Sequence, residues 1–156
     1  MGTNSKDKPG VVISPPLLYL GSIALGVALH FIYPITWRSD LDWKILGVIL
    51  IAFSLFTMQW AARLMRNAGT NINPEKPTIA IIQTGPYRFS RNPLYLSMTL
   101  IQLGIAFILG SLWVIAMLLV VLVTMNWGVI QREERYLVRK FGEEYVLYQG
   151  RVRRWI

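Results

Sequence analysis

An uncharged run of 37 residues, from Leu94 to Ile130, constrains the fold of this chain more than any other feature. As a single α-helix it would reach roughly 55 Å, almost twice the thickness of the hydrocarbon core of a bilayer. The run therefore has to fold back on itself, and Gly110-Ser111 is the one plausible break. We predict a tight helical hairpin with membrane-spanning helices at residues 94–109 and 112–130.

Two further apolar runs are long enough to span a membrane, at residues 14–35 and 45–65. Ser14 can cap the first of them, and Pro15-Pro16 would occupy its first turn. Apolar residues make up 54% of the chain and charged residues 15%, against roughly one quarter charged in soluble proteins. We therefore predict a single domain over residues 1–156, an all-α, multi-pass integral membrane protein with about four transmembrane helices. A soluble helical bundle is disfavoured, because it could not bury these runs.

The Lys and Arg residues predict the orientation of the helices. Fourteen of the sixteen lie before the first span, in or just before the polar loop 66–92, or in the tail 131–156. Arg38 and Lys44 lie on the other side. By the positive-inside rule both termini are cytoplasmic, and we expect the inner or plasma membrane of a prokaryote. Because the basic charge follows membrane topology, we predict contact with membrane lipids and no nucleic-acid partner.

The charged tail, residues 131–156, keeps apolar and aromatic side chains at near-helical spacing. We expect an amphipathic helix at the cytoplasmic face that continues from the fourth span and turns at Gly142 or Gly150. The residues that would form its apolar side are Tyr136, Leu137, Phe141, Tyr145 and Tyr148.

The first candidate site lies where the loop 66–92 meets the third span. Gly85-Pro86 predicts a tight turn, and Asn92-Pro93 predicts an N-cap followed by proline at the first helical position. Arg91 would lie at the helix N-terminus, where the helix dipole and the guanidinium together favour an anion. The alternative is a juxtamembrane anchor that binds lipid phosphates, and this motif alone leaves both readings open.

The second candidate site is the pair Glu133-Glu134, directly after the fourth span. Carboxylates so close to a membrane are costly unless they are paired or bind a cation or a hydroxyl. Taken alone, the motif favours surface ion pairs of Glu134 with Arg139 or Lys140. The chain has no cysteine and one histidine, His30, which we interpret as a packing residue, so the sequence predicts no metal site.

These motifs occur in a recognisable order. The order is Gly85-Pro86-Tyr87, Arg91-Asn92-Pro93-Leu94-Tyr95, the uncharged hairpin, Glu133-Glu134, and Phe141-Gly142-Glu143-Glu144-Tyr145 with Tyr148. From about Arg66 onward, the chain resembles the isoprenylcysteine carboxyl methyltransferase family and the related membrane phospholipid N-methyltransferases.

The resemblance implies an enzyme that transfers a methyl group from S-adenosyl-L-methionine (SAM) to a lipophilic acceptor in the membrane, such as an isoprenylcysteine carboxylate or another small lipid. Carried over by position, the cofactor pocket would include Ile79, Ala80, Ile81, Ile82, Tyr87, Asn92, Pro93, Leu94, Tyr95 and Glu133. Arg91 suits the carboxylate of SAM, Glu133 suits its ammonium or ribose hydroxyls, and Tyr145 and Tyr148 offer stacking faces. The predicted catalytic residues are Arg91, Asn92 and Glu134.

Two departures from the family leave the acceptor open. Asn92 stands where the family usually has histidine, and Val129 stands where eukaryotic members have a substrate-binding arginine. One alternative is therefore a phosphatidylethanolamine-type N-methyltransferase, in which Glu134 would take a proton from the acceptor amine. A second alternative is a small non-catalytic protein for membrane assembly or lipid docking, which would not bind SAM.

Overall fold

A computed structural model of the chain describes residues 9–37, 40–74 and 76–156. In order, the elements are α1 (Pro15–Ile32), α2 (Leu41–Asn67), the 3₁₀ turn η1 (Gly85–Arg88), α3 (Pro93–Leu109), α4 (Leu112–Thr124), the π-helical segment η2 (Met125–Ile130), α5 (Gln131–Phe141) and α6 (Glu143–Arg151). The described residues contain no β-strand, only an isolated bridge between Thr36 and Ser111.

The prediction of an all-α membrane protein is confirmed. Within the described ranges, three helices are long and apolar enough to cross a membrane: α1, α2, and a continuous 30-residue helix, Leu112–Phe141, that comprises α4, η2 and α5. The remaining apolar helix, α3, has 17 residues, a length of about 25 Å. The first span ends at Ile32, before Pro34, and the second begins earlier than predicted, at Leu41.

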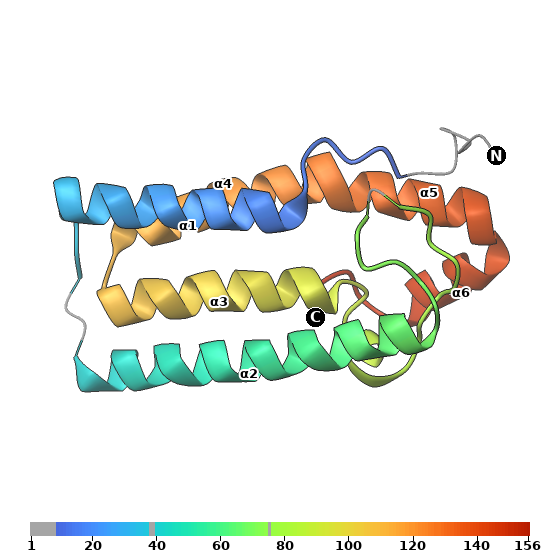
Figure 1. Cartoon of the computed structure of the whole chain (residues 1–156), viewed down its shortest axis with the longest axis horizontal. Helices are drawn as coiled ribbons and strands as arrows, with labels where there is room; N and C mark the ends of the chain where they lie inside the picture. Colours follow the sequence, from blue (N-terminus) through green and yellow to red (C-terminus); the bar gives the residue numbers. More distant parts are fainter. Residues whose placement is uncertain (1–8, 38–39, 75) are drawn as a thin grey trace.

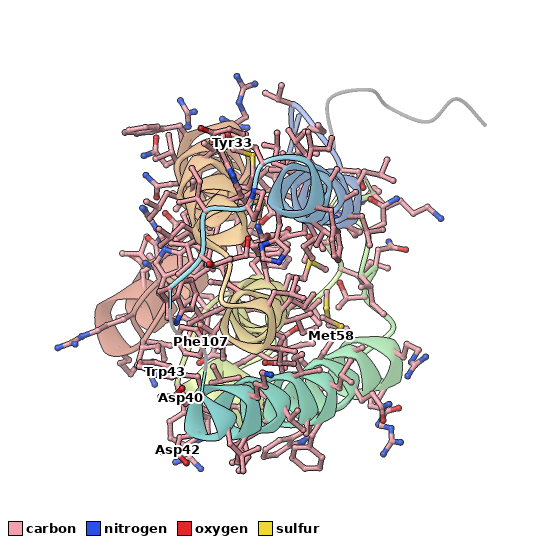
Figure 2. All side chains as sticks on the ribbon, turned by 90° about the vertical axis from the view of Figure 1, so that its left-hand side faces the viewer. Tyr33, Asp40, Asp42, Trp43, Met58 and Phe107 are labelled. Atoms are coloured by element: carbon pink, nitrogen blue, oxygen red, sulfur yellow. The ribbon has the colours of Figure 1, made fainter. Side chains whose placement is uncertain are left out.

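The predicted hairpin between α3 and α4 turns at Gly110-Ser111. Gly110 ends α3 in the left-handed conformation, with φ of 61°, and the hydroxyl of Ser111 accepts a hydrogen bond from the amide of Val114. The link between α1 and α2 runs beside this turn, because the amide of Trp37 donates to the carbonyl of Gly110 at 3.1 Å. Figure 2 views this end of the bundle, where the rings of Trp43 and Phe107 lie 5.1 Å apart.

Helix α3 lies between α2 on one side and the pair α1 and α4 on the other (Figure 1). It approaches α2 through glycines, since a β-carbon on Gly104 would lie 2.7 Å from the carbonyl oxygen of Gly47. Close backbone contact through small residues is typical of helix packing in membranes. Polar side chains join α3 to α1, where the Tyr19 hydroxyl lies 2.7 Å from Thr99 Oγ1.

The loop 66–92, α5, α6 and the end of the chain gather at one end of the bundle, opposite the α3–α4 turn (Figure 1). Helix α5 continues the fourth span as predicted, and the chain turns at Gly142, which adopts φ of 57°; Gly150 instead lies inside α6. This arrangement brings the predicted cytoplasmic segments together. Lys6, Lys8 and Arg38, which contributed to the predicted orientation, lie outside the described residues.

Candidate active site

A cavity of about 120 Å³ lies where the loop 66–92, the start of α3, α5 and α6 meet. It brings together residues that are far apart in the sequence. The predicted site residues that line it are Ala80, Ile81, Ile82, Tyr87, Arg91, Asn92, Pro93, Leu94, Tyr95, Glu133, Glu134, Tyr145 and Tyr148. Ile79 is the exception, because it is 62% exposed and lies outside the lining of the cavity.

The turn η1 positions Tyr87 in the wall of the cavity. Gly85 adopts φ of 59°, a conformation that favours glycine, and a β-carbon there would lie 2.6 Å from Leu64 Cδ1 of α2. The predicted tight turn is therefore confirmed, and it packs directly on the end of α2. The hydroxyl of Tyr148 in α6 donates to the carbonyl of Tyr87 at 2.7 Å, which fixes the turn against the tail.

Asn92 occupies the predicted N-cap position of α3, but its side chain makes no capping hydrogen bond. The side-chain amide of Asn92 instead donates to the backbone carbonyl of Arg154 at 3.0 Å, and the hydroxyl of Ser90 donates to the same carbonyl at 3.3 Å. The backbone amide of Arg91 donates to the carbonyl of Arg153 at 3.0 Å. The prediction of a side-chain cap was therefore wrong, because residues 153 and 154 return to the start of α3 and engage its polar groups.

Glu134 is buried and faces two guanidiniums. Arg154 binds both of its carboxylate oxygens, with distances of 3.1 Å from Nε to Oε1 and 2.6 Å from Nη2 to Oε2. Arg91 Nη1 lies 3.2 Å from Oε1. The expectation that Glu134 forms surface pairs with Arg139 or Lys140 was wrong, because Glu134 lies on the inner side of α5 while both basic residues are exposed.

Glu133 lines the same cavity and accepts a hydrogen bond from the Tyr95 hydroxyl at 2.7 Å. Both neighbouring carboxylates therefore face the cavity. They lie in the first turn of α5, which follows the π-helical segment η2, and π-helical segments are frequent at functional sites. Asn126 of η2 also belongs to this polar network, since its Oδ1 accepts from Arg154 Nη1 at 2.8 Å.

The tyrosines of the site are neutral hydrogen-bonding groups. Burial raises the pKa of Tyr145 to about 12, with Glu134 acting in the same direction and Arg91 opposing it. Burial, Tyr148 and Glu133 together raise the pKa of Tyr87 still further. At neutral pH these phenols keep their protons, so they can donate hydrogen bonds and present uncharged rings.

Two buried polar groups in the cavity make no hydrogen bond to the part of the chain that the structure describes. They are the Tyr87 hydroxyl and the Arg91 guanidinium, whose Nε and Nη1 both lack a hydrogen bond, although Nη1 lies 3.2 Å from Glu134 Oε1 in an ion pair. A buried polar group without a partner costs about 1–3 kcal/mol, and more when it is charged. A ligand with an anionic or hydrogen-bond-accepting group would satisfy both, and this chemistry fits the carboxylate and hydroxyls of SAM.

The loop before η1 forms the outer wall of the cavity. The amide of Ile79 donates to Thr70 Oγ1 at 2.9 Å, and the amide of Thr78 donates to the Tyr136 hydroxyl at 3.3 Å. The first bond lies within the loop, and the second ties the loop to α5. The sequence did not predict four polar residues of the site region: Thr70, Asn126, Tyr136 and Arg154. Only Tyr136 carried a signal, because its near-helical spacing placed it on the predicted tail helix.

The sequence model of a known family, described as phospholipid methyltransferase, matches residues 43–144, which are 102 of the 156 residues. The chain belongs to this phospholipid methyltransferase family. The matched region begins in α2 and contains the whole hairpin, both carboxylates of the site and the start of α6. The predicted relationship is confirmed at this level, and the isoprenylcysteine branch stays a prediction.

An uncharacterized protein of Haemophilus influenzae is 40% identical to the chain over 63 residues, which are 40% of this chain and the whole of that protein. No solved structure matches the chain. The assignment to the phospholipid methyltransferase family therefore rests on the family's sequence pattern. It makes the chain a membrane methyltransferase by family, and the roles of individual residues follow only from the chemistry of the cavity.

Tyr87→Phe tests whether the unpaired hydroxyl serves a ligand. Because this hydroxyl has no partner in the described part of the protein, we expect the free energy of unfolding to stay the same or rise by up to about 1 kcal/mol. Affinity for S-adenosylhomocysteine (SAH), the product form of SAM, should fall about tenfold in calorimetric titration. As a contrast, Tyr148→Phe removes a made hydrogen bond and should lower stability by about 1 kcal/mol. If Tyr87→Phe bound SAH as tightly as the wild-type protein, the Tyr87 hydroxyl would not be a contact of the ligand.

Proposed function

We propose that the protein is a SAM-dependent methyltransferase that acts on a lipophilic acceptor embedded in the membrane. The observation that carries this proposal is the buried Arg91 guanidinium, whose Nε and Nη1 make no hydrogen bond within the described residues. It shares one cavity with the Glu133 carboxylate and with the Tyr87 hydroxyl, which also has no partner among those residues. In a membrane methyltransferase family, this set of groups matches the polar parts of SAM.

Each part of SAM has a partner of suitable chemistry. Arg91 would bind the carboxylate, and Glu133 would bind the ammonium or the ribose hydroxyls. Tyr145 and Tyr148 offer aromatic faces, with ring centroids 6.0 Å apart, and the apolar wall formed by residues 80–82 suits the adenine. The cavity of about 120 Å³ has room for roughly four water molecules, so we expect the loop 66–92 to move outward when a ligand as large as SAM binds.

When bound, SAM supplies an electrophilic methyl group. The protein's own contribution is then to hold the acceptor in line with that group and to exclude water. Asn92 has no titratable proton and donates to the carbonyl of Arg154, so we assign it to holding the start of α3. Catalysis of this kind needs no strong base when the acceptor is already a carboxylate.

A phospholipid N-methyltransferase is the second candidate, because Glu133 could serve an amine acceptor. An acceptor ammonium has to lose a proton before it can attack. Glu134 is poorly suited to take it, since both of its carboxylate oxygens already contact guanidinium nitrogens of Arg154 and Arg91. Glu133 contacts the neutral hydroxyl of Tyr95, so among the two carboxylates it is the better general base.

The membrane location gives the two substrates separate routes. The cavity lies at the end of the bundle that the positive-inside rule places in the cytoplasm, so polar SAM would enter from that side. A lipid acceptor would reach the same site laterally from the bilayer. Both termini would then be cytoplasmic, which fusion reporters at residue 156 and in the α1–α2 link can check.

Methyl-transfer assays in lipid nanodiscs test the proposal and separate its branches. Purified protein would receive radiolabelled SAM with either phosphatidylethanolamine or a prenylcysteine as acceptor. We expect label in the lipid-extractable fraction with one of them, and more transfer at higher pH if the acceptor is an amine. Tight SAM binding without methyl transfer to either lipid would mean that the methyl acceptor is a different molecule. A complete lack of SAM binding would instead favour the non-catalytic docking protein.

A further inference from the structure

Arg154 connects three parts of the site, two through its guanidinium and the third through its backbone carbonyl. Its Nε and Nη2 bind the two oxygens of Glu134 in α5, and its Nη1 donates to Asn126 in η2. Its backbone carbonyl accepts from Asn92 and Ser90 at the start of α3. A planar fork with donors on all three nitrogens suits this set of contacts, whereas the ammonium of a lysine could not make them together.

The charges around Glu134 do not cancel. One carboxylate faces two guanidiniums, and it binds Arg154 through two contacts but Arg91 through only one, at 3.2 Å. The pairing therefore satisfies Glu134 mainly through Arg154 and leaves positive charge on Arg91. The side chains of Arg91 and Glu134 are each only 11% exposed, so water compensates little of that charge.

We propose that Arg154 is a positioning residue that keeps Arg91 available for the carboxylate of the ligand by occupying Glu134. The inference rests on the proposed function, because it assigns Arg91 to an anionic group of SAM. Without Arg154, Glu134 would be free to form a two-pronged pair with Arg91, the arrangement that guanidinium and carboxylate favour. Arg91 would then be neutralised inside the protein and would no longer attract the ligand.

This mechanism predicts a specific pattern of affinities for SAH, measured by calorimetric titration of the full-length protein in detergent. Arg154→Ala should bind SAH about tenfold more weakly than wild type, the effect of losing one charge-assisted hydrogen bond. Adding Glu134→Gln to Arg154→Ala should restore the affinity to within about threefold of wild type, because a neutral amide cannot capture the charge of Arg91. In turnover assays the single variant should raise KM for SAM more than it lowers kcat.

Two further variants complete the experiment. Arg153→Ala removes the same charge from an exposed neighbouring side chain and should bind SAH as wild type does. Arg154→Lys keeps the positive charge but not the planar guanidinium, so it should bind SAH with an affinity between those of wild type and Arg154→Ala. It replaces Arg154→Ala in the experiment if that variant does not fold. Size-exclusion chromatography checks the folding of each variant.

The outcomes are distinguishable. Weak binding by Arg154→Ala with recovery in the double variant supports the inference. Unchanged affinity in Arg154→Ala overturns it, and so does weak binding that Glu134→Gln fails to restore, since Arg154 would then have only a structural role. A wild-type protein that binds no SAH would overturn the proposed function itself, and this inference with it.

Discussion

Glu133→Ala is expected to weaken SAH binding by about a hundredfold, the largest effect of any single substitution in the site. The physical reason is the loss of a charged partner for the ammonium or ribose hydroxyls inside a cavity with little water, an interaction of about 3 kcal/mol. The substitution also leaves the buried Tyr95 hydroxyl without its acceptor, so we expect stability to fall by about 1–3 kcal/mol. Calorimetric titration and thermal unfolding measure the two effects separately.

Two matched variants separate charge from packing at Glu133. Glu133→Gln keeps an acceptor for the Tyr95 hydroxyl, so it should preserve stability while still weakening SAH binding. Glu144→Ala removes the same charge from an exposed position in α6 and should leave SAH binding unchanged. Wild-type affinity in Glu133→Gln would refute the assignment of an ionised Glu133 to the ligand.

Gly104→Leu is expected to cause the largest loss of stability. A β-carbon at this position would lie 2.7 Å from both the carbonyl oxygen of Gly47 and Cγ1 of Ile51, closer than packed atoms allow. Helices α2 and α3 would have to separate, at a cost of about 3 kcal/mol or more. In detergent we expect Tm to fall by about 8 °C, together with a loss of SAH affinity, because α3 begins at the site.

The control for this prediction is Gly21→Leu in α1. Gly21 is exposed and a β-carbon there would have nothing within 4 Å, so the same substitution should leave Tm unchanged or slightly higher. A Gly104→Leu protein as stable as Gly21→Leu would show that α2 and α3 do not pack as closely as the structure describes.

The helices could be predicted because the residues that start and end them are neighbours in the sequence. An uncharged run that is too long for one span must turn, and Gly110-Ser111 supplies both a residue that tolerates positive φ and a residue that caps the next helix. Gly142 likewise ends α5 at positive φ. The small residues that bring α2 and α3 together carry no such signal, since Gly47 and Gly104 are distant in the sequence.

The candidate site was predictable only in part. The order of the motifs predicted that Tyr87, Arg91, Tyr95 and Glu133 belong to one cofactor site. The structure places these residues around one cavity. Helical spacing suggested surface partners for Glu134, whereas the turn at Gly142 and the course of α6 bring Arg154 to it from 20 residues further along the chain. Contacts of this kind depend on tertiary structure and leave no periodic pattern.

The measurement that tests the central claim most directly is calorimetric titration of SAH into the wild-type protein in detergent, with Glu133→Ala titrated in parallel. We predict saturable binding at one site per chain in the wild-type protein and binding about a hundredfold weaker in the variant. If folded wild-type protein binds no SAH, or if both proteins bind it equally, the cavity between the loop 66–92, α3, α5 and α6 is not the cofactor site.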